Sequence, residues 1–436
     1  LSFVCVLRHF SFSFYAPIAG VINAQLQWKF FPSHLILMTQ PYKKDNHGDH
    51  IDRISELPGN VIDCILKHLN VQDLVRTSIW SRKWRYMWIS VPRIEFEEGF
   101  YNLFDNLDDP ASEFSRIITE ILFLHNGPIN EFIIDLPPDS KHKITFGCLN
   151  KWILFLSRKD VKYISLDNSA KDHVRTPSNL FSCRGLTYFK LNYFNMSIPP
   201  SFCGFKSLLH LHLQFITFDS GALESLLPGC PLLEELSIVY CSGYKCIDLS
   251  SSTLTELTVS IEESCVFRLN KSLPIIQRLN VELVCEMLYP HADIFPLSQL
   301  INLKYLSLDD VNLDKREELL YIVSVLKSAS NLVEFDIATY YSMASKRLAP
   351  DPSEKLECSV CCLSELQEVN IRVRRKSKHA MSLARFILAK SSSLKSLTIR
   401  LPFGIESDAL ILSSISRDLL RMERASQKAQ VELTHG

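Results

Sequence analysis

Glycine is scarce in this sequence, and its scarcity argues against a large class of enzymes. Only 13 of the 436 residues are glycine, about 3% against a usual figure of about 7%. Loops that cradle phosphate groups need glycine for close backbone approach, yet neither a G-x-G-x-x-G nor a P-loop pattern is present. The G-x-S-x-G and H-E-x-x-H patterns of hydrolases and zinc proteases are missing as well. We therefore expect a non-catalytic protein that needs no cofactor.

A strong charge of either sign and a long apolar run are also lacking. The chain has 47 Lys and Arg against 48 Asp and Glu, a net charge of −1, which argues against a protein that coats a polyanion. The long uncharged stretch His9–Trp28 is interrupted by histidine, serine, asparagine and glutamine, so it is too polar for a membrane span. We expect neither a nucleic acid nor a membrane as partner.

Cysteine is present but thinly spread, with 13 residues in the chain, below the density of a disulfide scaffold. The apolar surroundings predict buried free thiols at Cys64, Cys148, Cys265 and Cys285. The one tight cluster, Cys358–Cys362, has no second pair to complete a zinc site, so we expect no metal. Reduced thiols favour a location in the nucleus, the cytoplasm or both.

The amino-terminal segment differs from the rest of the chain. The first methionine is Met38, followed by a polar stretch that ends at His50. We expect residues 1–50 to be a non-native or disordered leader, with translation starting at Met38.

A compact helical module is predicted at residues 51–97. Leu57-Pro58 marks the start of a helix, and a single apolar stripe follows at i, i+3, i+4 and i+7 from Ile62 to Leu69. A second helix is expected near Asp73, and a third should carry Trp84 and Trp88 on one face. A module this small usually leaves apolar surface for a partner.

The segment Asp52–Trp88, DRISELPGNVIDCILKHLNVQDLVRTSIWSRKWRYMW, resembles the F-box, with Trp80 where a leucine is common. The resemblance implies docking to the Skp adaptor of a cullin-based ubiquitin ligase. Carried over by position, the contacts would be Leu57, Pro58, Ile62, Ile65, Leu66, Leu69, Leu74, Val75 and Trp84. The alternative is that these side chains form the core of a three-helix domain.

An L-x-x-L-x-L pattern with apolar replacements recurs through most of the remaining chain. Its eleven occurrences begin at residues 129, 161, 186, 208, 233, 254, 276, 303, 332, 366 and 394. The mean spacing of about 26 residues lies in the range of leucine-rich repeats. Between them, helices are expected near 219–233, where an acidic residue should cap the start, and at 315–327 and 381–390.

These patterns predict an α/β fold: a leucine-rich-repeat solenoid with curved parallel strands and short convex helices, preceded by a small three-helix F-box. LPGCPLLEEL (Leu227–Leu236) resembles the irregular repeats of plant F-box proteins, and Cys361–Leu401 resembles their FBD domain. We place the repeats at 98–357 and an FBD-like region at 358–430.

Side chains between the pattern leucines should face the concave side, because strand side chains alternate. Ten acidic and four basic residues occupy these positions: Glu131, Asp135, Asp167, Lys190, Glu235, Glu256, Arg278, Glu282, Asp309, Glu334, Asp336, Glu368, Arg372 and Arg400. The candidate substrate-binding residues are Tyr188, His210, Glu235, Glu256, Tyr305 and Glu334. We hypothesise that this face binds a protein with a basic segment; the alternative is a solvated face with no dedicated partner.

His210 and His212 stand two apart on one strand face and could in principle bind a metal, but no carboxylate or cysteine is expected in register with them, so we take them as surface histidines.

Taken with the resemblance, these features predict the substrate-recognition subunit of an SCF-type ubiquitin ligase. Its partners would be the Skp-type adaptor, through it a cullin, and a protein substrate. The alternative is a leucine-rich binding module of another class, such as an extracellular receptor fragment.

Overall fold

The structure is a computed structural model, and it forms two compact units, Leu1–Ile164 and Ser165–Gly436. It describes residues 56–78, 83–104, 106–136, 146–168, 174–244, 246–249, 253–261, 266–268, 275–283, 300–313, 316–339, 363–373, 378–401 and 409–435. The expectations for residues 1–50, for Trp80, for Cys265 and Cys285 and for the Cys358–Cys362 cluster fall outside these residues.

The described part of the first unit begins with the three expected helices, α4 (Gly59–Leu66), α5 (Val71–Thr77) and η2 (Trp84–Ser90). Pro58 stands directly before α4, and the Asn70 side chain caps α5 by accepting a hydrogen bond of 2.9 Å from the Asp73 backbone N–H. The third helix is a 3₁₀ helix, and it still buries both Trp84 and Trp88.

A short strand and an aromatic cluster complete the first unit. Strand β1 (Arg93–Phe96), which the sequence did not predict, pairs in parallel with β2 (Glu131–Leu136). The other elements are α6 (Glu98–Tyr101), η3 (Asn102–Phe104), α7 (Pro110–Leu124) and α8 (Phe146–Leu156). Phe104 and Phe114 meet edge to face with ring centroids 5.7 Å apart, and Phe96 touches Phe132 across the strands. These rings form the core under β1 and β2.

Strand β3 (Tyr163–Asn168) crosses the boundary between the units, and the second unit continues with a parallel sheet. The strands, in spatial order, are β5 (Tyr188–Asn192), β7 (His210–Gln214), β9 (Glu235–Val239), β11 (Glu256–Ile261), β13 (Arg278–Leu283), β14 (Tyr305–Val311), β15 (Glu334–Thr339), β16 (Glu368–Arg372), β17 (Ser396–Leu401) and β18 (Gln430–His435). All eleven predicted pattern positions are followed by a strand that starts two residues later, and β18 is an additional strand.

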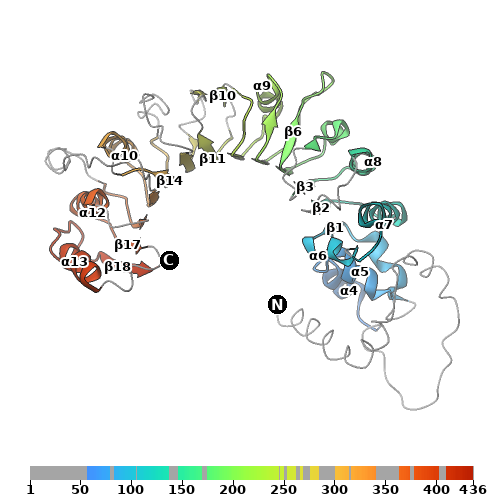
Figure 1. The fold of residues 1–436 in the computed structure, drawn as a ribbon, viewed down its shortest axis with the longest axis horizontal. Helices are drawn as coiled ribbons and strands as arrows, with labels where there is room; N and C mark the ends of the chain where they lie inside the picture. Colours follow the sequence, from blue (N-terminus) through green and yellow to red (C-terminus); the bar gives the residue numbers. More distant parts are fainter. Residues whose placement is uncertain are drawn as a thin grey trace, which may run out of the picture. The chain divides into compact units, whose positions relative to one another are not determined.

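The pattern leucines form buried ladders because the strands pair in register. Leu211, Leu236 and Leu257 are consecutive partners, and none of them is exposed. Helices α9 (Ala222–Leu226), α10 (Arg316–Ser328), α12 (Lys378–Lys390) and α13 (Ala409–Leu420) lie on the other side of this sheet, whose strands line the inner side of a curve (Figure 1). The predicted α/β solenoid of parallel strands is confirmed.

Two small parallel sheets accompany the main sheet among the described strands. One contains β4 (Val174–Arg175), β6 (Phe194–Met196) and β8 (Thr217–Phe218), and the other contains β10 (Cys246–Asp248) and β12 (Val266–Arg268). One more 3₁₀ turn, η5 (Ser178–Ser182), precedes β5, and another, η6 (Leu227–Gly229), follows α9.

Two local expectations were wrong. The acidic cap proposed for the helix near 219–233 is absent: Gly221, with φ of +78°, precedes α9, and Asp219 contributes only its backbone carbonyl to the Ala222 N–H. Cys64 is exposed rather than buried, because it lies on the outer side of α4, and Cys148 is half-buried. Among the described residues, no helix is long and apolar enough to cross a membrane.

Candidate functional site

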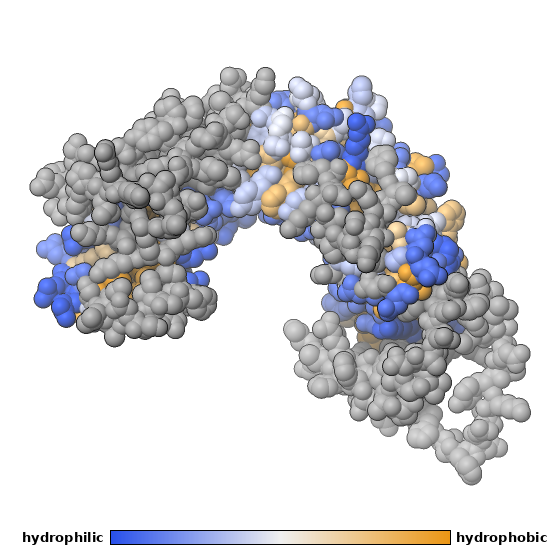
Figure 2. Space-filling model, in the orientation of Figure 1, coloured by the Kyte–Doolittle hydropathy of each residue, from blue (hydrophilic) through white to orange (hydrophobic). Residues whose placement is uncertain are grey.

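The six candidate substrate-binding residues lie in one row across the strands of the second unit. Strand register makes Tyr188, His210, Glu235 and Glu256 consecutive partners, and the row continues through Arg278, Tyr305, Glu334 and Glu368. We call the surface formed by this row, together with the two rows that follow two and four residues further along the strands, the strand face. Its side chains alternate with the buried leucines, and blue, hydrophilic surface appears there near β13 and β14 (Figure 2).

Two histidines and a glutamate form a cluster at the start of the strand face. The Glu235 carboxylate lies 3.1 Å from His210 Nδ1 and 3.7 Å from His212 Nε2, so the expectation that no carboxylate stands in register was wrong. Tyr188 packs on both imidazoles, with ring centroids 5.9 Å and 5.0 Å away. Burial lowers the pKa of His212, although Glu235 opposes this by favouring the charged ring. No group of three or more His, Cys, Asp or Glu able to hold a metal occurs within the described residues.

A continuous polar network extends from β11 to β16. Arg278 lies 3.8 Å from the Glu256 carboxylate and stacks over the Tyr305 ring at 4.1 Å. The Tyr305 hydroxyl donates to Asp336 at 3.0 Å, and the Asn370 amide donates to the same carboxylate at 2.7 Å. Burial and the nearby Asp336 raise the pKa of Tyr305. The network holds the Tyr305 ring in a fixed orientation in the middle of the strand face.

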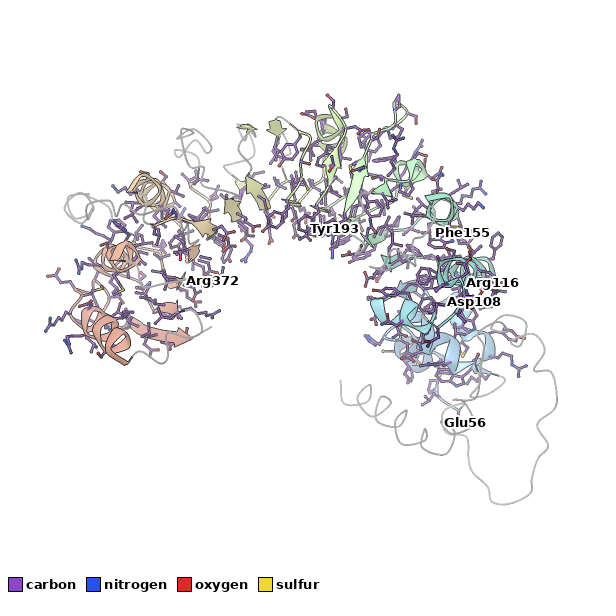
Figure 3. All side chains as sticks on the ribbon, viewed as in Figure 1. Glu56, Asp108, Arg116, Phe155, Tyr193 and Arg372 are labelled. Carbon is purple, nitrogen blue, oxygen red and sulfur yellow. The ribbon has the colours of Figure 1, made fainter. Side chains whose placement is uncertain are left out.

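Part of the acidic charge on the strand face is paired with the cations counted on the same face. In addition to the Arg278 pair, Arg372, which is labelled in Figure 3, donates to Asp309 at 2.8 Å across the intervening strand. Burial raises the pKa of Asp309, and Arg372 opposes that rise. By contrast, Glu334 and Glu368 are direct register partners, and neither carboxylate makes a hydrogen bond or ion pair within the described part of the chain. Like charges placed opposite each other destabilise a sheet.

A ladder of three aromatic rings at the end of strands β5, β7 and β9 was missed by the sequence reasoning. Tyr193 and Phe215 stack with centroids 4.3 Å apart, and Phe215 and Tyr240 stack at 5.0 Å. Each has a positive φ, 60°, 50° and 52° respectively, a conformation that costs roughly 1–2 kcal/mol in a non-glycine residue. The signal was present, since each aromatic stands seven residues after the first leucine of its pattern.

Comparisons with known proteins identify three segments of the chain. The F-box domain family model matches residues 54–96, the model described as "FBD-associated F-box protein At5g56370, LRR repeats" matches residues 149–282, and the FBD model matches residues 359–399. F-box/FBD/LRR-repeat protein At1g13570 of Arabidopsis thaliana is 28% identical over 88% of this chain and 99% of its own length. These matches place F-box, leucine-rich-repeat and FBD segments in one chain, which is similar over most of its length to a plant F-box/FBD/LRR-repeat protein.

A second relative carries the same three domain names in its description. F-box/FBD/LRR-repeat protein At1g78750 of Arabidopsis thaliana is 25% identical, over 68% of this chain and 59% of that protein. Among solved structures, an internalin from Listeria monocytogenes is similar with a TM-score of 0.35 at 12% identity, covering 76% of this chain and 96% of that one. A similarity this weak indicates neither a function nor a partner.

The matched segments correspond to particular elements. The F-box match runs from the approach to α4 through η2 to the end of β1, and the FBD match contains β16, α12 and most of β17. The FBD is thus two further strands of the same parallel sheet with a helix between them.

The nine candidate adaptor-binding residues of the F-box divide into two groups by burial. Five of them are at most 3% exposed and form the core of the module: Ile62, Leu66, Leu74, Val75 and Trp84. The other four remain accessible: Leu57, Pro58, Ile65 and Leu69. Val61, which the sequence reasoning did not select, is 36% exposed and lies one turn before Ile65 on α4. The accessible surface, formed by these four residues and Val61, is called the F-box surface below.

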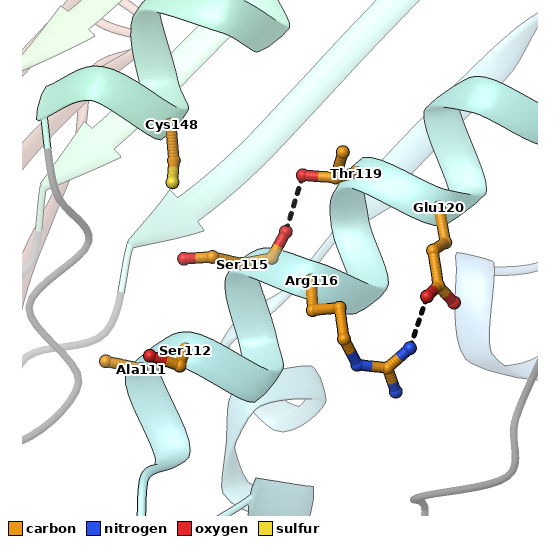
Figure 4. A pocket seen from close by; sticks show the side chains of 7 residues that line it. All are labelled: Ala111, Ser112, Ser115, Arg116, Thr119, Glu120 and Cys148. Atoms are coloured by element: carbon orange, nitrogen blue, oxygen red, sulfur yellow. Dashed lines mark hydrogen bonds and ion pairs between the residues drawn. The ribbon is translucent and has the colours of Figure 1, made fainter.

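Outside the F-box match, a pocket of about 480 Å³ opens between α7 and α8 (Figure 4). It is lined by Ala111, Ser112, Ser115, Arg116, Thr119, Glu120 and Cys148. Arg116 pairs with Glu113 and Glu120, and both ion pairs raise its pKa. Its charge is therefore neutralised, and the pocket offers hydroxyl groups rather than a charged centre.

Proposed function

We propose that this chain is the substrate-recognition subunit of an SCF-type ubiquitin ligase, acting in the nucleus, the cytoplasm or both. The F-box docks on a Skp-type adaptor, which connects the chain to a cullin, and the strand face holds a protein target. Catalysis comes from the proximity of that target to the ubiquitin-conjugating enzyme. The F-box match, in a chain that also carries a long strand face, carries the proposal.

The accessible stripe on α4 supports adaptor docking. A helix in a small module normally buries its apolar residues, yet Val61 and Ile65 flank the buried face and remain accessible beside Leu57 and Pro58. Lys83 Nζ donates to the Leu57 carbonyl at 3.2 Å, which fixes the start of this stripe against η2. Apolar side chains held in place at a surface favour a protein partner.

The first test is adaptor binding by the intact chain. Val61→Glu combined with Ile65→Glu should weaken recovery of a Skp-type adaptor by at least about tenfold, since charges replace apolar contacts at the centre of the interface. Asp63→Lys, on the other flank of α4, is the matched control and should bind normally. Circular dichroism checks that all three chains are folded; equal recovery with the double variant would reject adaptor docking through this surface.

The second proposal concerns the target: the strand face binds a basic segment. Its support is the pair of facing carboxylates Glu334 and Glu368, which lack a cation among the described residues. A lysine or arginine side chain from a target would relieve their repulsion.

Binding of a basic segment is tested by fluorescence anisotropy with two synthetic peptides of equal length, one rich in Arg and Lys and one rich in Glu. The basic peptide should bind the wild-type chain more tightly than the acidic peptide does. Glu334→Lys together with Glu368→Lys should weaken the affinity for the basic peptide about tenfold. Glu365→Lys, in the exposed turn before β16, makes the same type of charge change outside the row and should have little effect.

Charge reversal at Glu235, Glu256 and Glu334 together should likewise weaken target capture and spare adaptor binding. Unchanged peptide affinity in these variants would contradict the proposal.

A further inference from the structure

We infer that the carboxyl-terminal ends of α7 and α8 form a second protein-binding surface, and that it takes an acidic segment with large apolar side chains. This α7–α8 surface consists of Phe123, Leu124, Lys151, Leu154, Phe155, Arg158 and Lys159. It lies in the first unit but outside the F-box match, and it does not belong to the strand face. It is therefore independent of both surfaces in the proposed function.

The apolar part of the surface is concentrated. Eight large apolar side chains are exposed in the described part of the chain, and three of them gather here: Phe123 (80% exposed), Leu124 (41%) and Leu154 (38%). The rings of Phe123 and Phe155 approach with centroids 6.5 Å apart, so the two helices contribute to one patch. Figure 2 shows orange surface beside blue surface over this region, and Figure 3 places Phe155 on α8. A patch of this kind on a folded chain favours a partner.

The sequence of α8 predisposes it to this arrangement. Lys151, Leu154, Phe155 and Arg158 follow at i, i+3, i+4 and i+7, which places them on one stripe of the helix and its extension. The opposite side buries Trp152, Ile153 and Leu156. Trp152 Nε1 donates to Thr119 at 3.0 Å, which fixes α8 against α7. The exposed stripe is thus held in place by core packing on the other side of the helix.

The charge around the patch is basic. Lys151 and Arg158 are exposed at the two ends of the stripe, and Lys159 Nζ lies 5.3 Å from the centroid of the Phe155 ring. The neighbouring acidic groups have partners: Glu120 pairs with Arg116, and Asp160 pairs with Lys162 at 2.8 Å. Among the described residues, these cations have no acidic partner, so the patch offers apolar contact between positive charges. A complementary segment carries Asp or Glu on both sides of large apolar residues.

One turn towards the amino terminus of α7, Thr119 and Glu120 line the pocket described above. A bound segment that covers Phe123 and continues in that direction meets its serine and threonine hydroxyls. The surface is therefore long enough for a short peptide rather than a single side chain.

The inference is tested by selecting peptides from a random phage-displayed library on the intact chain and measuring enriched sequences as synthetic peptides by fluorescence anisotropy. We expect enriched peptides to combine Asp or Glu with Phe, Leu or Trp, and to bind more weakly as salt concentration rises. Phe123→Ala, and separately Lys151→Glu with Arg158→Glu, should each weaken their binding by at least about tenfold.

Matched controls come from α13 at the other end of the chain. Leu420→Ala removes an apolar side chain of similar exposure, 76%, and Arg417→Glu with Arg421→Glu reverses two exposed cations; both should leave the affinity unchanged. All variants should still recover the Skp-type adaptor.

Three outcomes of the selection would overturn the inference. The enriched peptides could be basic, they could bind the Phe123 and Lys151/Arg158 variants as well as wild type, or the selection could enrich no peptide at all. A concentration-dependent dimer abolished by Phe123→Ala would overturn it as well, since a second copy of the chain would then be the occupant.

Discussion

Trp84→Ala should unfold the F-box and abolish adaptor binding as a consequence. Trp84 is completely buried in η2, with the buried Ile62 and Leu66 in the same module. Removing a buried indole costs about 3–5 kcal/mol, and a module of this size has little stability to lose. Limited proteolysis and hydrogen exchange of residues 56–104 measure the unfolding, and a pulldown measures adaptor recovery.

The same variant separates the two roles that the sequence left open for Trp84. A contact residue would lose the adaptor while the module keeps its protection from exchange, whereas a core residue loses both together. Tyr86→Ala is the matched control, since Tyr86 is an aromatic of the same helix that is 59% exposed, and its removal should change stability by less than about 0.5 kcal/mol. Normal protection of the module in Trp84→Ala would contradict its assignment to the core.

Gly243→Ala should destabilise the repeats by about 3–5 kcal/mol while leaving the F-box intact. Gly243 has a φ of +86°, and a methyl group there would collide with the backbone carbonyl of Phe218 in β8. The backbone cannot retreat easily, because the Phe218 N–H donates to the Ser242 carbonyl at 2.8 Å. The substitution therefore adds backbone strain to a steric clash. Denaturant unfolding and hydrogen exchange of β8 and β9 provide the measurement.

Gly221→Ala separates strain from collision. Gly221 also has a positive φ, +78°, but no atom lies within 4 Å of the position a methyl would take. Gly221→Ala should lower the free energy of unfolding by only about 1–2 kcal/mol. Both glycine variants should recover the adaptor as wild type does. If Gly243→Ala were no worse than Gly221→Ala, close packing at β8 would not explain the need for glycine.

Eleven strands could be predicted from the sequence, whereas β1 and β18 could not, and the difference has a physical reason. The leucine pattern predicted eleven strands because burying one face of a strand requires apolar residues at every second position. Strand β1 was missed because Arg93–Phe96 is too short to display that alternation clearly, and it forms through pairing with β2. β18 was missed because Gln430–His435 lacks the leading leucines, and its pairing with β17 decides it.

For the candidate sites, the sequence determined which residues share a row, and the three-dimensional structure decided what each can touch. Strand periodicity was sufficient to place Tyr188, Tyr305 and Glu334 together on the strand face. Which carboxylates are neutralised depends on side chains from other strands: Arg372 reaches Asp309 across a distance of 63 residues in the chain. No local pattern encodes such a pair.

By itself, the sequence determined a small helical module followed by regularly repeated strands, because helix stripes and strand alternation are local consequences of burial. The F-box and the FBD were recognised by their resemblance to known families. Only the tertiary structure decided which apolar residues remain available to partners. Leu66 and Ile65 are neighbours in one apolar stripe, yet packing buries the first and leaves the second accessible. On α7, likewise, Phe114 is buried and Phe123 is exposed. Burial depends on what packs against a residue and not on the residue itself.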